Sequence, residues 1–97
     1  MGKASITNLL PNGRAREFSA GLGSELKRRR LEARLSQGDV SAPLTRAYVS
    51  QVERGMVLPS LPALIVLAER LGTTAHEILE EVNRTLNWEY AAAHEDH

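Results

Sequence analysis

The sequence predicts an all-α fold of five short helices in one small domain. Apolar residues recur at spacings of three and four, and the stretches between them carry Ser, Thr, Gly and Pro where helices begin and end. No stretch shows the pattern of a strand. With 97 residues, 42% of them hydrophobic, the chain has material for one core and not for two.

The first helix follows a long N-terminal segment. Residues 1–20 show no sustained period and include the turn signal PNG, so we expect a flexible arm. A helical pattern begins at about Ser19 or Gly21 and places Leu22 and Leu26 on one stripe. The sequence LSQGD then ends this helix. The arm contains two arginines that could enter a minor groove or remain without contact.

Two short helices come next. Ser36 is placed to cap the first of them, and Pro43 ends it because the residue before a proline avoids the α conformation. Thr45 is the natural N-cap of a helix over residues 46–54. Gly55 stands just past its end, where glycine adopts a left-handed conformation without strain.

The last two helices complete the domain. Ser60 caps the segment LPALIVLAERLG, which is apolar nearly all round and therefore predicts a central, buried helix. Thr74 and Glu77 have the spacing of a capping box and open the fifth helix. We therefore expect a domain over residues 21–82, followed by a helical extension and tail over residues 83–97.

The extension carries a second apolar feature. Ile78, Val82, Leu86 and Tyr90 recur every four residues, which predicts an extended C-terminal helix reaching about residue 92. A small domain does not easily cover two apolar faces, and exposed apolar patches mark interfaces. We expect a homodimer with Leu86, Trp88 and Tyr90 at its interface. The alternative is that the tail folds back on its own core.

Two charged residues occupy inward positions. Arg30 shares a stripe with Leu22 and Leu26, and Glu53 lies four residues after the inward Val49. A lone buried charge is costly, so the simplest inference is that Arg30 and Glu53 form a buried ion pair. The alternative is that either helix is rotated and both charges are solvated.

The net charge of zero conceals a division. Residues 1–60 carry ten Lys or Arg against five Asp or Glu, a net charge of +5, and residues 61–97 carry −5. The first part is suited to a polyanion. No cysteine is present, which excludes disulfides and thiolate metal sites and fits a cytoplasmic location. Apolar runs are too short to span a bilayer.

The segment SQGDVSAPLTRAYVSQVERGMVLPSLPALIVLAERLG resembles the helix-turn-helix of the phage-repressor-like (Cro/repressor, XRE) family. The similarity runs from about Leu22 to Leu79 and rests on the spacing of S-Q, of S/T-R-x-x-[IV]-S-x-[ILV]-E-R-G, of P-S-L and of L-A-x-x-L-G. RAYVSQVERG is also similar to controller proteins of restriction–modification operons. The resemblance implies a repressor-like DNA-binding domain whose helix over residues 46–54 lies in the major groove.

The resemblance implies roles for single residues. Arg46, Ala47, Ser50 and Gln51 match positions that read bases, and Tyr48 would reach the backbone or a thymine methyl group. Arginine can bond guanine bidentately, and glutamine can bond adenine in the same way. The remaining implied contacts are to phosphates. They come from Gln37, which would also support the recognition helix, and from Ser36 beside it. Separately from the resemblance, Lys27, Arg28, Arg29 and Arg34 form a basic stretch in which one or two cations, Arg28 and Arg34, are expected to face phosphates and the rest to be solvated. The family's equivalents of Arg30 and Glu53 form a buried pair.

Two departures from the family pattern stand out. The turn VSAPL is about two residues shorter than usual, so Leu44 is expected to fill the core there. The residue after E-R-G is often basic and contacts phosphate, but here it is Met56. Either those contacts are lost, or the loop packs on something apolar.

Three classes of function were compared. The leading one is a sequence-specific regulator, repressor or controller, that binds double-stranded DNA as a homodimer. The second is an antitoxin whose apolar tail or Met56-Val57-Leu58 loop binds a toxin. An enzyme is not expected because no nucleophile–base set, phosphate loop or metal-ligand set is visible. His76, His94 and His97 do not converge with other ligands, so neither a metal nor a cofactor is expected.

Overall fold

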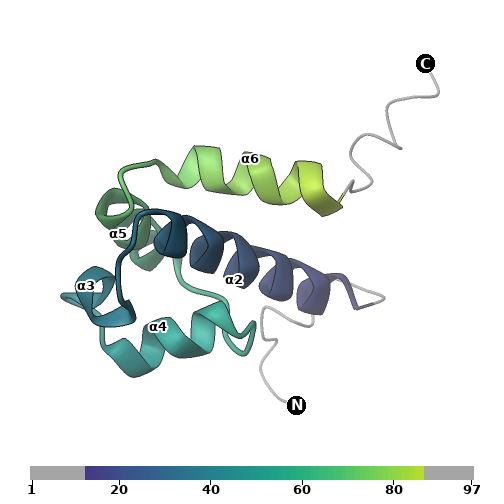
Figure 1. Cartoon of the computed structure of the whole chain (residues 1–97). Coiled ribbons are helices and arrows are strands. Elements are labelled where there is room, and N and C mark those ends of the chain that lie inside the picture. Colours follow the sequence, from purple (N-terminus) through teal and green to yellow (C-terminus); the bar gives the residue numbers. More distant parts are fainter. Residues whose placement is uncertain (1–12, 87–97) are drawn as a thin grey trace, which may run out of the picture.

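The computed structural model describes residues 13–86. Within this range the chain forms five α-helices and no strand: α2 (Arg14–Glu32), α3 (Gln37–Ser41), α4 (Arg46–Glu53), α5 (Leu61–Arg70) and α6 (Ala75–Leu86). Figure 1 shows α2 as the long helix in the middle, with α6 on one side of it and α4 on the other. The all-α prediction is confirmed.

Helix α2 begins earlier than the sequence suggested. It starts at Arg14, directly after Gly13 in a left-handed conformation, so the part of the expected arm that the structure describes is helical. The buried positions of its first turns are Ala15 and Ser19, which continue the stripe of Leu22. Small and polar buried residues give almost no hydrophobic period, so the pattern did not reveal this part of the helix.

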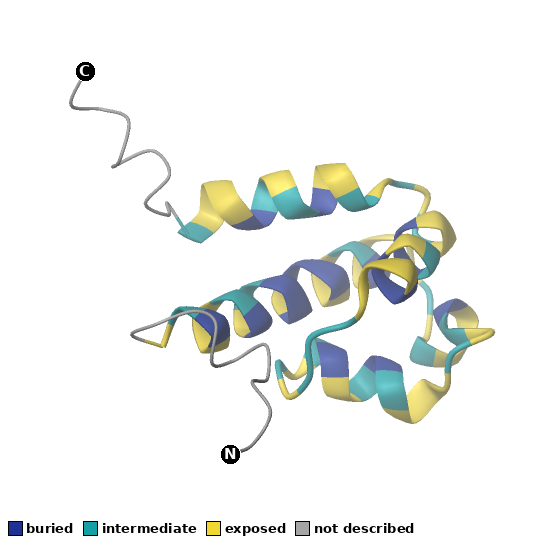
Figure 2. Ribbon diagram, turned by 180° about the vertical axis from the view of Figure 1, so that it is seen from behind, coloured by how far each residue is buried: buried dark blue, intermediate teal, exposed yellow. Residues whose placement is uncertain are grey.

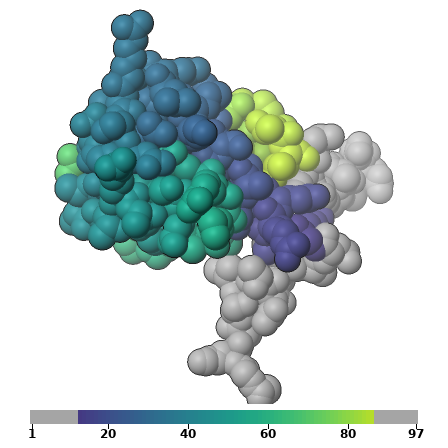
Figure 3. Space-filling view, turned by 60° about the horizontal axis from the view of Figure 1, so that its bottom comes forward, coloured from purple at the N-terminus to yellow at the C-terminus, as the bar shows by residue number. Residues whose placement is uncertain are grey.

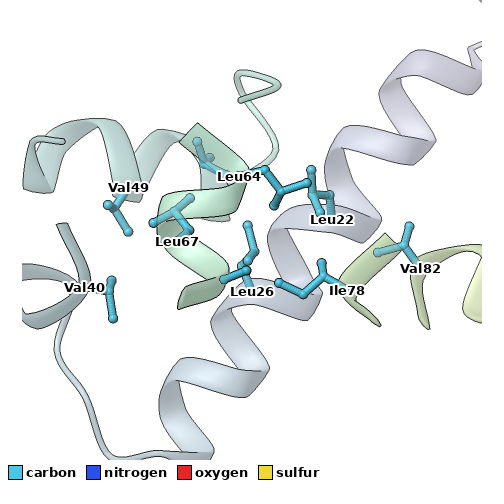
Figure 4. Packing of buried hydrophobic residues seen from close by; sticks show 10 residues of the cluster. Leu22, Leu26, Val40, Val49, Leu64, Leu67, Ile78 and Val82 are labelled. Carbon is cyan, nitrogen blue, oxygen red and sulfur yellow. The ribbon is translucent and has the colours of Figure 1, made fainter. Parts of the chain in front are cut away.

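The core lies between the five helices, with α4 and α6 packed directly on α2, and α3 and α5 packed on those two. Figure 4 shows side chains from α2, α3, α4, α5 and α6 pointing toward one another. Its buried members are all aliphatic, which leaves no polar atom to satisfy inside it. They are Leu22, Leu26, Val40, Val49, Val52, Leu64, Leu67, Ala68, Ile78 and Val82. Leu44, in the short turn before α4, packs against this cluster as the sequence predicted.

The close approach of α2 and α4 depends on one glycine. A Cβ atom at Gly23 would lie 2.3 Å from the Val52 carbonyl oxygen and 2.6 Å from that of Glu53. No real Cβ atom approaches backbone so closely, so only glycine fits here. Gly55, with φ of 75°, turns the chain after α4 and packs against Ala20 of α2. These two contacts fix the end of α4 on α2.

The expectation that α5 is buried all round is wrong. Ala63, Leu64, Leu67 and Ala68 are buried, but Leu61 is 61% and Ile65 is 42% exposed. Figure 2 shows that α5 has one buried side and one exposed side. The helix lies at the edge of the domain, where it meets its neighbours on one side only.

Helix α6 uses its apolar stripe inside the domain. Ile78 and Val82 are buried against α2, and Leu86 packs on the same core, 3.5 Å from the position of a Cβ on Gly21. Leu86 is partly buried, so between Ala75 and Leu86 the apolar stripe of this helix faces the domain's own core. Trp88 and Tyr90 lie outside the described residues, as do the arm before residue 13 and the tail.

Candidate nucleic-acid interface

Helix α4 is held at both ends and presents one side outward. The Thr45 hydroxyl oxygen accepts a hydrogen bond from the Tyr48 backbone N–H at 3.0 Å, which caps its start. Gly55 turns the chain after its end. Val49 and Val52 face the core and are buried. The other side carries the residues predicted to read bases: Arg46, Ala47 and Gln51 are exposed, and Ser50 and Tyr48 are half-buried.

The predicted pairing of Arg30 with Glu53 is present. Arg30 Nε donates to Glu53 Oε2 at 2.6 Å, and its Nη2 donates to Oε1 at 2.9 Å. The remaining Nη1 donates to the Leu35 carbonyl oxygen at 2.9 Å. Both side chains are buried, and the bidentate geometry satisfies the charges that burial would leave costly. This pair joins α2 to the last residue of α4.

Gln37 joins the same cluster. Its Nε2 donates to Glu53 Oε1 at 3.0 Å, so the first residue of α3 supports α4 as the sequence predicted. Burial by itself would raise the pKa of Glu53, but hydrogen bonds from Arg30 and Gln37 hold it below its ordinary value. Glu53 is therefore ionised at neutral pH. The orientation of α4 depends on three side chains from three different helices.

Helix α3, which precedes the short turn before α4, begins with a reciprocal cap. The Ser36 hydroxyl oxygen accepts from the Asp39 N–H at 3.0 Å, and the Ser36 N–H donates to Asp39 Oδ2 at 2.7 Å. These bonds to Ser36 lower the pKa of Asp39. Helix α3 ends at Ser41, and the four residues before Arg46 include a cis peptide bond at Ala42–Pro43. The Ser36 hydroxyl keeps its own proton available for a further acceptor.

The cations of α2 fall into two groups. Arg28 donates from Nε and Nη2 to Glu25 and from Nη1 to Glu32, and Arg29 Nε donates to Glu25 at 2.6 Å. Glu25 is buried beneath them; burial would raise its pKa, but these bonds hold it below its usual value. Both arginines are thus neutralised by acids of their own helix.

The structure places Arg28 away from the outward side of α4. Together with Glu81, Thr85 and Leu86 it lines a groove of about 740 Å³ between α2 and α6. That groove is on the side of α2 away from α4 (Figure 1), so Arg28 is remote from the outward residues of α4. Because two carboxylates also hold its guanidinium, its position does not support a phosphate contact beside α4.

Other cations near α4 remain available. Arg16, Arg34, Arg46 and Arg54 are exposed, and their side chains make no hydrogen bond or ion pair within residues 13–86. Arg34 has a positive φ of 62° in the turn before α3. Reasoning from the sequence missed Arg54 and considered Arg16 only as an arm residue that could enter a minor groove or remain without contact. Arg54 could have been found as the C-cap of α4, whereas Arg16 needed the true start of α2.

These features make up two helices joined by a tight turn, with the second helix anchored inward and polar outward. The model of a helix-turn-helix domain family matches residues 21–80 of the chain. The chain belongs to this family. The helix-turn-helix consists of α3 and α4, and membership indicates a DNA-binding domain with a role in transcription regulation. No curated protein and no solved structure gives a significant match.

Two further observations concern other kinds of site. Within residues 13–86, no group of three or more His, Asp or Glu side chains is arranged to hold a metal ion. The helices over that range are too short or too polar to cross a membrane. The candidate site within these residues is the surface around α4.

Proposed function

We propose that the protein is a sequence-specific regulator of transcription, related to the Cro/repressor type, that binds double-stranded DNA with α4 in the major groove. The observation that carries this proposal is the division of α4 into two sides. Its inward side is fixed by Val49, Val52 and the Glu53 cluster, and its outward side is exposed and rich in groups that bond bases. A rigid helix with free polar side chains is what base reading requires.

The outward residues have distinct roles in this proposal. Arg46 in the first turn bonds a guanine, and Gln51 bonds an adenine, each by two hydrogen bonds. Ala47 is small and allows the helix to approach the bases closely. Ser50 and Tyr48 are half-buried and contact bases or backbone at the edge of the surface.

The phosphate contacts come from the turn before α3 and from its start. Arg34 is exposed there, and the Ser36 hydroxyl proton is not used by its cap. Gln37 uses one amide proton on Glu53 and has a second one for a phosphate oxygen. Phosphate contacts of this kind set the register of the protein on the duplex.

The protein is further proposed to act as a homodimer, in the cytoplasm, on a pseudo-palindromic site. Paired recognition helices then lie about 34–36 Å apart, one turn of DNA. Leu86, Trp88 and Tyr90 are the proposed interface residues; Leu86 is partly buried against the core, and Trp88 and Tyr90 lie outside the described residues. Sedimentation at tens of micromolar, alone and with operator DNA, tests the dimer. A monomer in both conditions contradicts it.

Selection of bound sequences from random DNA tests base reading. The wild type should enrich one motif, and Arg46→Ala should relax the preference at one position in each half-site. The expected loss of discrimination is about 1–3 kcal/mol at that position and little elsewhere. Arg84→Ala, on α6, removes the same charge and should leave the motif unchanged. A wild type that enriches no motif rejects the proposal.

A second candidate is favoured by a different surface. Met56 is 63% exposed in the α4–α5 loop, and Leu61 and Ile65 are exposed on α5. Exposed apolar groups of this kind suit a protein partner, as in an antitoxin that binds a toxin and regulates its own operon. A stoichiometric small protein that co-purifies with the wild type and is lost with Met56→Ser supports this candidate. A wild type that purifies without such a protein argues against it.

A further inference from the structure

The first turns of α2 reach the far end of α4. Gly55 packs so closely on α2 that a Cβ there would lie 3.1 Å from the Ala20 Cα. Arg16 lies four residues before Ala20, on the same side of the helix and one turn nearer its start. Helical side chains lean toward the N-terminus, so Arg16 extends past Gly55 along the α4–α5 loop.

Arg16 and this loop enclose a groove. The groove has a volume of about 530 Å³ and is lined by Arg16 and Ser19 of α2 and by the loop residues from Gly55 to Ser60. The loop sequence GMVLPS contains no basic residue. Arg16 therefore supplies a positive charge at a place where the loop has none. This charge is there only because α2 starts at Arg14.

Arg54 adds a second charge at the same end of α4. It is the C-cap residue of α4 and directly precedes Gly55. Like Arg16, it is exposed and has no side-chain hydrogen bond or ion pair among the residues that the structure describes. On the opposite side of α2, Arg28 and Arg29 are held by Glu25. The exposed Arg16 and Arg54 are thus left free, whereas Arg28 and Arg29 are neutralised by Glu25.

The end of α4, which carries Arg54, and the start of α2, which carries Arg16, lie on one face of the molecule. Figure 3 shows α4 and the first turns of α2 together on the surface that is turned forward. A helix in the major groove has a phosphate backbone on each side of it. Arg34 and Ser36 precede α3, and Arg16 and Arg54 lie at the C-terminal end of α4, so α4 separates the two sets.

We propose that Arg16, together with Arg54, binds phosphates of the DNA backbone at the C-terminal end of α4. This inference rests on the proposed function, because it requires α4 to lie in the major groove. It also accounts for the phosphate contact that the family usually makes through the residue after E-R-G. Met56 leaves that position without a charge, and α2 provides the guanidinium instead. Arg16 acts on affinity and not on sequence preference, because phosphates carry no sequence information.

The salt dependence of binding measures this contact directly. Each phosphate that a cation neutralises contributes about 0.9 to the slope of log affinity against log salt. Arg16→Ala should therefore lower the slope by about one unit. Between 50 and 200 mM salt the wild type should lose about threefold more affinity than the variant. Arg54→Ala should show the same change, and Arg16→Lys should restore the wild-type slope.

The matched control is Arg84→Ala, which removes the same charge from α6 and should leave the slope unchanged. Circular dichroism of each variant verifies the fold, since all three arginines are exposed. If Arg16→Ala and Arg54→Ala keep the wild-type slope, the proposed contact is overturned. A wild type that binds without sequence preference rejects only the proposed function, because the slopes still test the contact. A wild type that binds no DNA overturns both.

Discussion

The two sides of α2 neutralise their buried charges in different ways. Toward α4, a buried guanidinium and carboxylate from different helices meet in a bidentate pair, and the exposed arginines remain free. Toward α6, Glu25 is surrounded by arginines of its own helix, at spacings of three and four residues. The first arrangement joins helices and leaves charge for a ligand, whereas the second neutralises charge locally. In the proposed function, the side that keeps free charge is the side that meets the DNA.

The packing of α4 on α2 also differs from the packing of α6 on α2. At Gly23 the backbones of α2 and α4 are in contact, so that side tolerates no added atom. At Gly21, on the side of α6, a Cβ would meet only the Val82 and Leu86 side chains at 3.5 Å, an ordinary contact distance. Helix α4 therefore meets α2 backbone to backbone at Gly23, whereas α6 meets α2 through side chains at Gly21.

The largest effect is expected from Glu53→Ala. Removing the carboxylate leaves Arg30 buried without its partner and frees Gln37 from α4. Breaking a buried pair in this way costs about 3–5 kcal/mol, so the free energy of unfolding, measured with urea, should fall by this amount. Glu32→Ala removes an exposed partner of Arg28 and serves as the control, with a cost below about 1 kcal/mol. Equal losses for the two variants would contradict the comparison.

Acid provides an independent check of the same pair. The folded-state pKa of Glu53 lies below its ordinary value of 4.5. Its contribution is therefore complete above that value and is lost as the pH falls through the folded-state pKa. The difference in stability between the wild type and Glu53→Ala should be constant near neutral pH and should narrow on acidification. A constant difference down to pH 3 would show that folding does not lower the pKa of Glu53.

The next largest effect on stability is expected from Gly23→Ala, with Gly21→Ala for comparison. Gly23→Ala inserts a methyl group against the Val52 and Glu53 carbonyl oxygens and must move α4 away from α2. We expect a loss of at least about 1–3 kcal/mol, the usual cost of overpacking, and weaker DNA binding. Gly21→Ala is the matched control, because it should be neutral or stabilise the helix by up to about 1 kcal/mol. Thermal melts that rank the two variants in the opposite order would refute the close approach.

The smallest effect is expected from Arg28→Ala. Its ion pairs are with residues of the same helix and its side chain is half-exposed, so the loss should stay below about 1 kcal/mol. Arg30→Ala, two residues further on, should cost several times more because it leaves Glu53 unpaired. If Arg28→Ala lowers the affinity for DNA more than Arg84→Ala does, Arg28 contacts the DNA.

Much of the site could be predicted because it depends on local chemistry. Ser36, Thr45, Ser60 and Gly55 mark helix ends through their own side-chain and backbone preferences, and the structure places caps or turns at all four. The inward period of α4 likewise predicts which of its residues face out. Two charges on facing stripes were sufficient to predict the Arg30–Glu53 pair, because burial leaves a charge few alternatives.

Other features could not be predicted because they depend on which elements become neighbours. The burial of Ala15 and Ser19 at the start of α2 and the exposure of Ile65 on an apolar helix leave no local period in the sequence, and the period of Leu86 does not show that it packs on Gly21. Nor does the sequence distinguish arginines held by Glu25 from the free arginine at position 16, since all are basic residues of one helix. The sequence by itself determined the helices, their caps and the outward residues of α4. Only the tertiary structure decided which side of α2 each charge occupies, because that depends on the contacts that α4 and α6 make with it.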